Sequence, residues 1–169
     1  MIKRCGFGVR DAIRSSLRCA YVRSKTKRLH GPRRFVLGES EVALILLGRN
    51  VMHSAPYFVD YYRSRGVTKM VYLDNGSSDG SDAFFSSLPD TIVAQCRLNF
   101  RDWQRELRYC LASDYASGGW RLAVDADELL DYRGSEQMNI PSLVSHLADR
   151  GFTGLVAQML EMVPRGHLR

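Results

Sequence analysis

The sequence predicts an α/β protein in which a mostly parallel sheet is flanked by helices. Two patterns lead to this prediction. Short apolar runs alternate along the chain with longer segments whose apolar residues recur at helical spacing, as in strand–helix–strand units. The first run, residues 41–48 (EVALILLG), is almost continuously apolar, which is typical of a strand that is buried on both faces.

The other expected elements follow this strand in a regular order. Ser54 and Pro56 are typical of a helix start, aromatic residues then recur at helical spacing, and Gly66 is typical of a helix end. The next strands are expected at residues 69–73, 91–96, 120–124 and 154–163, and the next helices at residues 81–88, 101–115 and 140–150.

Positive charge is concentrated at the start of the chain. Residues 1–34 contain eleven Lys or Arg and one acid, a net charge of +10, whereas residues 35–169 contain 13 Lys or Arg and 17 acids, a net charge of −4. The chain therefore divides into a basic leader, residues 1–34, expected to be helical or disordered, and a mildly acidic domain, residues 35–169. This division argues against nucleic-acid binding as the function of the whole chain.

The basic leader favours contact with a membrane surface over passage through a membrane. It lacks the apolar core of a secretory signal, and the longest clean apolar run, residues 42–47, is too short to span a bilayer. Blocks of like charge are usually solvated, which favours a solvated basic arm; the alternative is a basic amphipathic helix that lies on anionic lipids. We expect a cytoplasmic protein, for which peripheral contact at the inner membrane surface is the open alternative.

The four cysteines form neither a zinc-binding pattern nor a disulfide framework, because they are spaced 14, 77 and 14 residues apart. Cys96 and Cys110 lie in apolar stretches and are expected to be buried. A reducing compartment fits this use of cysteine.

Polar clusters follow three of the expected strands. Arg49 and Asn50 follow the first strand, residues 74–80 (DNGSSDG) follow the second, and residues 125–128 (DADE) follow the fourth. Parallel strands have their carboxyl ends at one edge of the sheet, and ligands bind there. The three clusters are therefore expected to meet in one site.

The acidic cluster predicts a divalent cation. Three carboxylates within four residues repel one another unless a cation compensates them, and oxygen ligands favour Mg²⁺ or Mn²⁺. Asp125 and Asp127 point to the same side of an extended chain, so they could share one metal. The alternative is an exposed acidic turn.

Residues 74–80 do not match the common calcium and phosphate loops. An EF-hand loop that starts at Asn75 would have Ser86 rather than Glu at its twelfth position. The chain has no G-x-x-x-x-G-K-[ST] and no G-x-G-x-x-G after a strand, which argues against P-loop NTPases and dinucleotide oxidoreductases. A turn without a ligand remains the alternative.

Taken in order, these clusters resemble those of family 2-type glycosyltransferases with the GT-A fold. Residues 72–81 (YLDNGSSDGS) are similar to the family signature D-(D/N)-x-S-x-D-G-(S/T), and residues 120–128 (WRLAVDADE) are similar to its W-x-x-x-x-D-A-D-E form of the Asp-x-Asp motif. Asp74 and Asp125 lie 51 residues apart, and the likeness covers residues 42–132.

The resemblance implies a metal-dependent glycosyltransferase whose donor is a nucleotide-diphosphate sugar. Asp74 would contact the base of the nucleotide, and Asp125 would lie by the ribose or the sugar. Asp127 would hold Mn²⁺ or Mg²⁺ on the diphosphate, and Asp125 could share that metal. The acceptor would be a saccharide, a lipid or a protein.

Three further residues are assigned to the nucleotide-sugar site by the same resemblance. Arg101 and Gln104, at the start of the helix after the third strand, would line the diphosphate or the sugar. Asn50 matches a family Asn-Glu pair at the end of the first strand, although Val51 replaces the acid here.

The catalytic base is not assigned. In this family it lies well beyond Asp-x-Asp, whereas only 41 residues follow Glu128, so we expect a GT-A domain that is incomplete at its C-terminus. Glu161, in an apolar run, is one candidate for the base. Two other functions stay open: a non-catalytic remnant that retains nucleotide binding, and a binder of membranes or nucleic acid that acts through residues 1–34.

Overall fold

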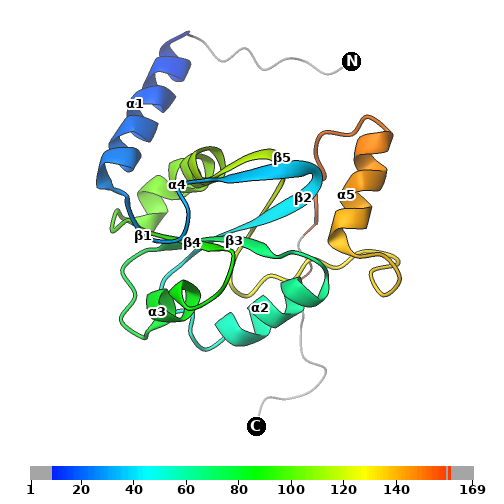
Figure 1. Cartoon of the computed structure of the whole chain (residues 1–169). Coiled ribbons are helices and arrows are strands. Elements are labelled where there is room, and N and C mark those ends of the chain that lie inside the picture. The colour runs from blue at the N-terminus through cyan, green and yellow to red at the C-terminus, as the bar shows by residue number, and fades with distance from the viewer. Residues whose placement is uncertain (1–8, 159, 161–169) are drawn as a thin grey trace.

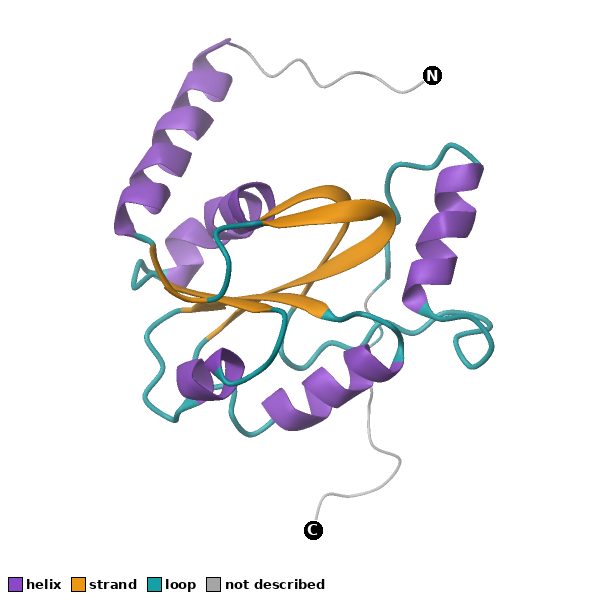
Figure 2. Ribbon diagram, in the orientation of Figure 1, coloured by secondary structure: helices purple, strands orange, loops and turns teal. Residues whose placement is uncertain are grey.

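A mostly parallel sheet lies between two groups of helices (Figures 1 and 2). The structure is a computed structural model, and it describes residues 9–158 and 160. The strands are β1 (Lys27–His30), β2 (Phe35–Gly48), β3 (Lys69–Asp74), β4 (Thr91–Gln95) and β5 (Ala116–Val124). The helices are α1 (Val9–Lys25), α2 (Ala55–Ser64), α3 (Ser81–Ser86), α4 (Phe100–Tyr115) and α5 (Ile140–Asp149). The prediction of an α/β protein with a mostly parallel sheet flanked by helices is confirmed.

The strand order brings the ends of β2 and β5 together. Across the sheet the order is β1-β4-β3-β2-β5, and the pairs β4-β3, β3-β2 and β2-β5 are parallel. From β2 the chain moves outward through β3 to β4, and α4 then returns it to the far side of β2. This reversal between β2 and β5 is the switch point at which open parallel sheets bind ligands.

Alternate residues of β2 pack into two separate cores. Ala43 and Ile45 lie in a core with buried residues of α1 and α4. Leu44 and Leu46 lie in the opposite core, with residues of α2, α3 and α5. The side chains of a strand alternate between the two faces of a sheet, so a continuous apolar run fills both cores at once.

The helical part of the basic leader, α1, is packed against the rest of the protein. Cys19 and Val22 of α1 are buried beside α4. Arg18 forms an ion pair with Glu106 at 2.7 Å, and Arg23 forms one with Asp114 at 2.8 Å. The leader was expected to be helical or disordered, and residues 9–25 are helical. The division at residue 34 does not separate two independently packed units.

Arginines of residues 1–34 that could have contacted a membrane surface contact α4 instead. Arg34 donates hydrogen bonds to the carbonyl oxygens of Asp114 and Ser113 at 2.9 and 3.1 Å. Arg18, Arg23 and Arg34 are therefore occupied by α4, and lipid contact through residues 1–34 stays a prediction. No helix within residues 9–158 combines the length and the apolar character that a membrane span needs.

The cysteines confirm the expected burial. Cys96 and Cys110 are 1% and 3% exposed, and both are free thiols. Burial, together with the nearby Cys19 side chain, raises the pKa of the Cys110 thiol to about 12. The Cys110 thiol is therefore protonated at neutral pH, which suits a packing role.

One predicted strand is wrong, and one observed strand was not predicted. The expected strand at residues 154–163 is wrong for the part that is described: residues 154–158 and 160 form no strand, and Val156 is 97% exposed. The remainder of that range lies outside the described residues. Conversely, β1 was not expected, because its four residues (KRLH) have no apolar alternation and are all exposed. β1 pairs antiparallel with β4 through its backbone.

A glycine pair allows β5 to run close to a bulge in β2. Gly118 and Gly119 both have positive φ, and a Cβ on Gly119 would lie 2.6 Å from the carbonyl oxygens of Gly38 and Glu41. We expect Gly119→Ala to lower the free energy of unfolding by about 2 kcal/mol, because the backbone must move or strain. Chemical denaturation measures this loss.

The matched control is Gly151→Ala. Gly151 also has a positive φ, but a Cβ there would meet no atom within 4 Å. Its substitution tests the left-handed conformation alone and is expected to cost about 1 kcal/mol. Equal losses in the two variants would contradict the close approach at Gly119.

Candidate functional site

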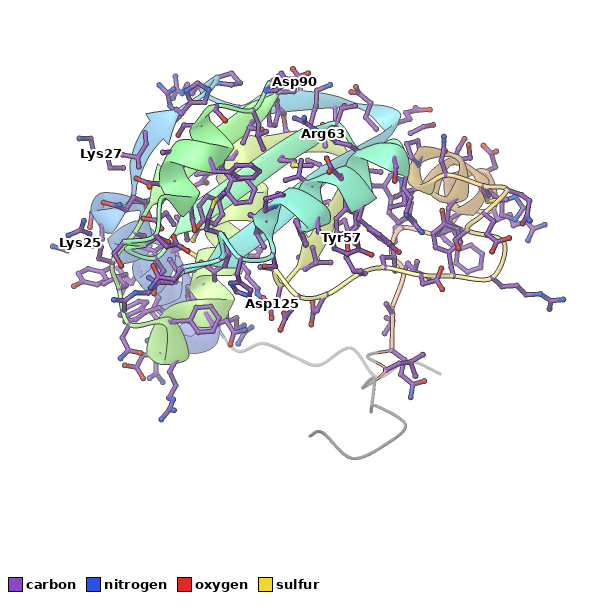
Figure 3. The ribbon with its side chains drawn as sticks, turned by 90° about the horizontal axis from the view of Figure 1, so that it is seen from below. Lys25, Lys27, Tyr57, Arg63, Asp90 and Asp125 are labelled. Atoms are coloured by element: carbon purple, nitrogen blue, oxygen red, sulfur yellow. The ribbon has the colours of Figure 1, made fainter. Side chains whose placement is uncertain are left out.

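A cleft of about 1100 Å³ opens at the carboxyl edge of the parallel strands. In Figure 3, Asp125 marks the carboxyl edge of the parallel strands and Asp90 marks the opposite, amino edge. Asp125 follows the end of β5, and Asp90 precedes the start of β4. The cleft is lined by residues 47–51, 53, 54, 75–78, 97–101 and 125–127. The polar clusters after β2, β3 and β5 thus meet in one site, as expected.

Four of the six site residues inferred from the sequence line this cleft: Asn50, Arg101, Asp125 and Asp127. Asp74 and Gln104 do not. Asp74 lies beneath the cleft floor and is fully buried, while Gln104 is half-buried on α4.

Asn50 joins the end of β2 to the loop after β3. Its φ of 55° is left-handed, a conformation that asparagine tolerates better than most residues. Its side-chain Oδ1 accepts a hydrogen bond from the backbone N–H of Ser78 at 2.8 Å, and its own N–H donates to Ser77 Oγ at 2.9 Å. In this structure Asn50 therefore shapes the wall of the cleft.

Asp74 holds the loop from inside. One carboxylate oxygen accepts from the backbone N–H of Ser77 at 2.9 Å; the other accepts from the N–H of Gly76 at 3.1 Å and from Gln95 Nε2 at 2.8 Å. Burial alone would raise the pKa of Asp74, but the hydrogen bonds from Ser77, Gln95 and Gly76 outweigh it and hold this pKa below the usual value. Residues 75–78, which follow Asp74, are the ones that reach the cleft.

The second acid of this loop ties it to the start of α2. Asp79 accepts hydrogen bonds from the backbone N–H groups of Ser81 at 3.0 Å and Met52 at 2.9 Å. The Ser81 hydroxyl in turn accepts from Val51 N–H at 3.0 Å. Residues 74–80 are therefore more than a solvated turn, because their side chains fix the loop against the segment after β2.

The acidic turn after β5 is closed by its own last residue. The Asp125 N–H donates to Glu128 Oε2 at 2.9 Å, and the Glu128 N–H donates to the Asp125 carbonyl oxygen at 3.0 Å. The Asp125 carboxylate accepts a hydrogen bond from Arg108 of α4. Asp127 is exposed at the cleft. The three acids of the cluster thus have three different environments.

Two tyrosines of α2 anchor the backbone that follows this turn. The Tyr62 hydroxyl donates to the Glu128 carbonyl oxygen and accepts from the Leu130 N–H, both at 3.0 Å. The Tyr61 hydroxyl donates to the Leu130 carbonyl oxygen at 2.8 Å. Tyr62 is fully buried, and burial raises its pKa to about 12. A tyrosine on the buried face of a helix is the sequence signal for such an anchor, because its hydroxyl needs a partner.

The walls of the cleft carry positive charge that the sequence analysis only partly identified. Arg49, Arg97 and Arg101 are exposed and line the same cleft as Asp125 and Asp127. Of these, Arg101 was assigned to the site and Arg49 belongs to a polar cluster that was expected there, whereas Arg97 was not expected. Arg97 lies two residues after the end of β4, which was the available signal. Three guanidinium groups, with the Asp125 charge compensated by Arg108, favour an anionic ligand.

The carboxylates fit a metal that arrives with a phosphate ligand. No group of three or more His, Cys, Asp or Glu side chains suited to a metal occurs among the described residues. Mg²⁺ commonly binds through one or two protein carboxylates and completes its shell with water and substrate phosphates. Asp127 and Asp125 at the cleft supply this smaller set.

The chain matches no model of a known protein family, no curated protein and no solved structure.

Proposed function

We propose that the chain is a glycosyltransferase whose cleft binds a nucleotide-diphosphate sugar and a divalent metal. The observation that carries this proposal is the meeting of the Asp125–Asp127 turn with residues 75–78 and the cleft arginines at the switch point of a parallel sheet. Ordered motifs of the same kind underlie the resemblance to GT-A enzymes.

The charges of the cleft suit a diphosphate. Arg49, Arg97 and Arg101 can bind phosphate oxygens, and guanidinium groups do so in bidentate geometry. Asp127 is the residue that would hold the metal, with Asp125 beside it. When bound, Mg²⁺ or Mn²⁺ would supply positive charge to the leaving nucleoside diphosphate.

The loop after β3 is suited to the nucleoside. Residues 75–78 line the cleft, whereas Asp74 is buried and engaged on both carboxylate oxygens. We therefore assign the nucleoside contact to the loop residues and a supporting role to Asp74. Glu161, the candidate base toward the acceptor, lies outside the described residues, and the acceptor class stays a proposal.

Thermal unfolding with UDP and Mn²⁺ tests the binding step. A ligand at 100 times its dissociation constant stabilises a protein by about 2.7 kcal/mol, so we expect a clear rise in Tm for the wild type. Asp127→Asn is expected to abolish most of this rise. Asp60→Asn is the matched control, because Asp60 is exposed on α2 and does not line the cleft.

The outcomes separate the parts of the proposal. An unchanged UDP–Mn²⁺ shift in Asp127→Asn would overturn the metal assignment. No shift with any of the common nucleoside diphosphates would overturn the nucleotide site. Binding without release of UDP from UDP-sugars, in the presence of saccharide acceptors, would favour the non-catalytic remnant.

A further inference from the structure

An ion pair joins the acidic turn to α4. Arg108 Nη2 donates a hydrogen bond to Asp125 Oδ1, and the two side chains are 32% and 36% exposed. Asp127, two residues further along, has no hydrogen-bond or ion-pair partner among the described residues. The two carboxylates that line the cleft thus differ, since one is compensated by a guanidinium group and the other is free.

Arg108 lies on α4 near the cleft but does not line it. Arg101 lines the cleft, and Arg108 follows it after seven residues, close to two helical turns, on the same side of α4. α4 therefore places the Arg101 guanidinium at the cleft and the Arg108 guanidinium beside the Asp125 carboxylate.

We propose that Arg108 is a positioning residue that makes divalent-cation binding at Asp127 depend on a diphosphate ligand. This inference rests on the proposed function. Arg108 holds Asp125 in a fixed orientation and cancels its charge, so that the two cleft-lining carboxylates offer a bare cation the net attraction of one, Asp127. The negative charges of a bound diphosphate supply the missing attraction, and metal and nucleotide then bind together.

The physical basis is the strength of nearby charges. A guanidinium within a few ångströms of a cation site repels a divalent ion, and at solvent-like dielectric this is worth about a tenfold change in affinity per unit charge. Without Arg108, both cleft-lining carboxylates, Asp125 and Asp127, would be available to a cation, and Mg²⁺ commonly binds through one or two protein carboxylates.

The test is titration of the full chain with Mn²⁺ alone, followed by electron paramagnetic resonance of the free ion. Arg108→Gln is expected to bind Mn²⁺ about tenfold more tightly than the wild type. Arg108→Lys keeps the charge and is expected to bind Mn²⁺ as weakly as the wild type. Arg121→Gln removes a positive charge from β5 without touching a carboxylate and serves as the control for net charge.

A second pair of variants ties the effect to Asp125. Adding Asp125→Asn to Arg108→Gln is expected to reverse the gain in Mn²⁺ affinity. Equal Mn²⁺ affinity in wild type and a folded Arg108→Gln, with folding checked by circular dichroism, would overturn the inference. An equal gain in Arg121→Gln would overturn it as well, since net charge would then explain the result.

The inference and the proposed function can fail separately. Unchanged Mn²⁺ affinity in Arg108→Gln, together with a UDP–Mn²⁺ shift that Asp127→Asn abolishes, would sink the role of Arg108 and leave the nucleotide site intact. Tighter Mn²⁺ binding in Arg108→Gln, with no nucleotide binding by any variant, would support charge compensation by Arg108 and remove the diphosphate from the proposal.

Discussion

Replacing Asp74 with alanine is expected to lower the free energy of unfolding by about 3–5 kcal/mol, the largest loss at any single residue of the site. The side chain is 0% exposed, and its carboxylate accepts hydrogen bonds from Ser77, Gly76 and Gln95. Alanine would leave these donors without partners in the interior, and hydrogen bonds to charged groups are the costly ones to lose. Urea denaturation followed by circular dichroism measures the loss.

The charge of Asp74 gives this prediction a pH dependence. Because the folded-state pKa lies below the ordinary value of 3.8, ionised Asp74 stabilises the folded protein at pH values above its unfolded pKa. That contribution is lost as the pH falls through the folded-state pKa. The stability difference between wild type and Asp74→Asn is therefore expected to be constant near neutral pH and to shrink below about pH 4. A difference that does not change with pH would contradict the ionised state.

Tyr62→Phe is expected to lower the free energy of unfolding by about 2–3 kcal/mol and also to weaken nucleotide binding. Phenylalanine fills the same space in the core, so packing is retained. The Leu130 N–H loses its acceptor, and the Glu128 carbonyl oxygen loses its donor. The turn that carries Asp125 and Asp127 would then lack its anchor to α2, and we expect the UDP–Mn²⁺ dissociation constant to rise about tenfold, the usual cost of a lost supporting contact at a metal site.

Two other tyrosines of α2 provide controls. Tyr57, labelled in Figure 3, is 66% exposed, and Tyr57→Phe is expected to change neither stability nor binding. Tyr61→Phe removes one hydrogen bond, to the Leu130 carbonyl oxygen, and is expected to have an intermediate effect. Normal UDP–Mn²⁺ affinity in a destabilised Tyr62→Phe would show that the anchor supports the fold alone.

The parallel sheet could be predicted because its determinants are local. The run at residues 42–47 is apolar at every position, and it serves both cores of the finished fold. Each polar cluster directly follows a strand, and the rule for parallel sheets then brings the clusters to one edge. Asn50, Asp125 and Asp127 were placed at this edge in this way without knowledge of any contact, whereas Arg101 was assigned through the resemblance to glycosyltransferases.

The contacts that support the site could not be predicted, because they join residues far apart in the chain. Arg108 and Asp125 are 17 residues apart, Tyr62 and Glu128 are 66 apart, and Arg18 and Glu106 are 88 apart. No periodicity within one segment specifies such pairs. The burial of Asp74 likewise depends on Gln95 of the neighbouring strand.

The error at residues 154–163 has a different cause. An apolar run indicates that a segment can form a strand, but it does not determine whether the segment lies beside an edge of the sheet. Residues 154–158 and 160 do not pair with β5, the last strand of the described sheet. The opposite error occurred at β1, where a polar segment found such an edge beside β4. Sequence patterning reports side chains, whereas strand pairing uses the backbone.

The pairing of β1 has a consequence for the behaviour of the protein in solution. β4 (TIVAQ) is apolar and rich in β-branched residues, and an uncovered edge of such a strand is a template for aggregation. β1 covers this edge and replaces it with a short, exposed strand that carries Lys27, Arg28 and His30. Charged and very short strands are poor templates. The basic segment that first resembled an arm for outside partners thus protects the β4 edge of the sheet against association with other copies of the protein.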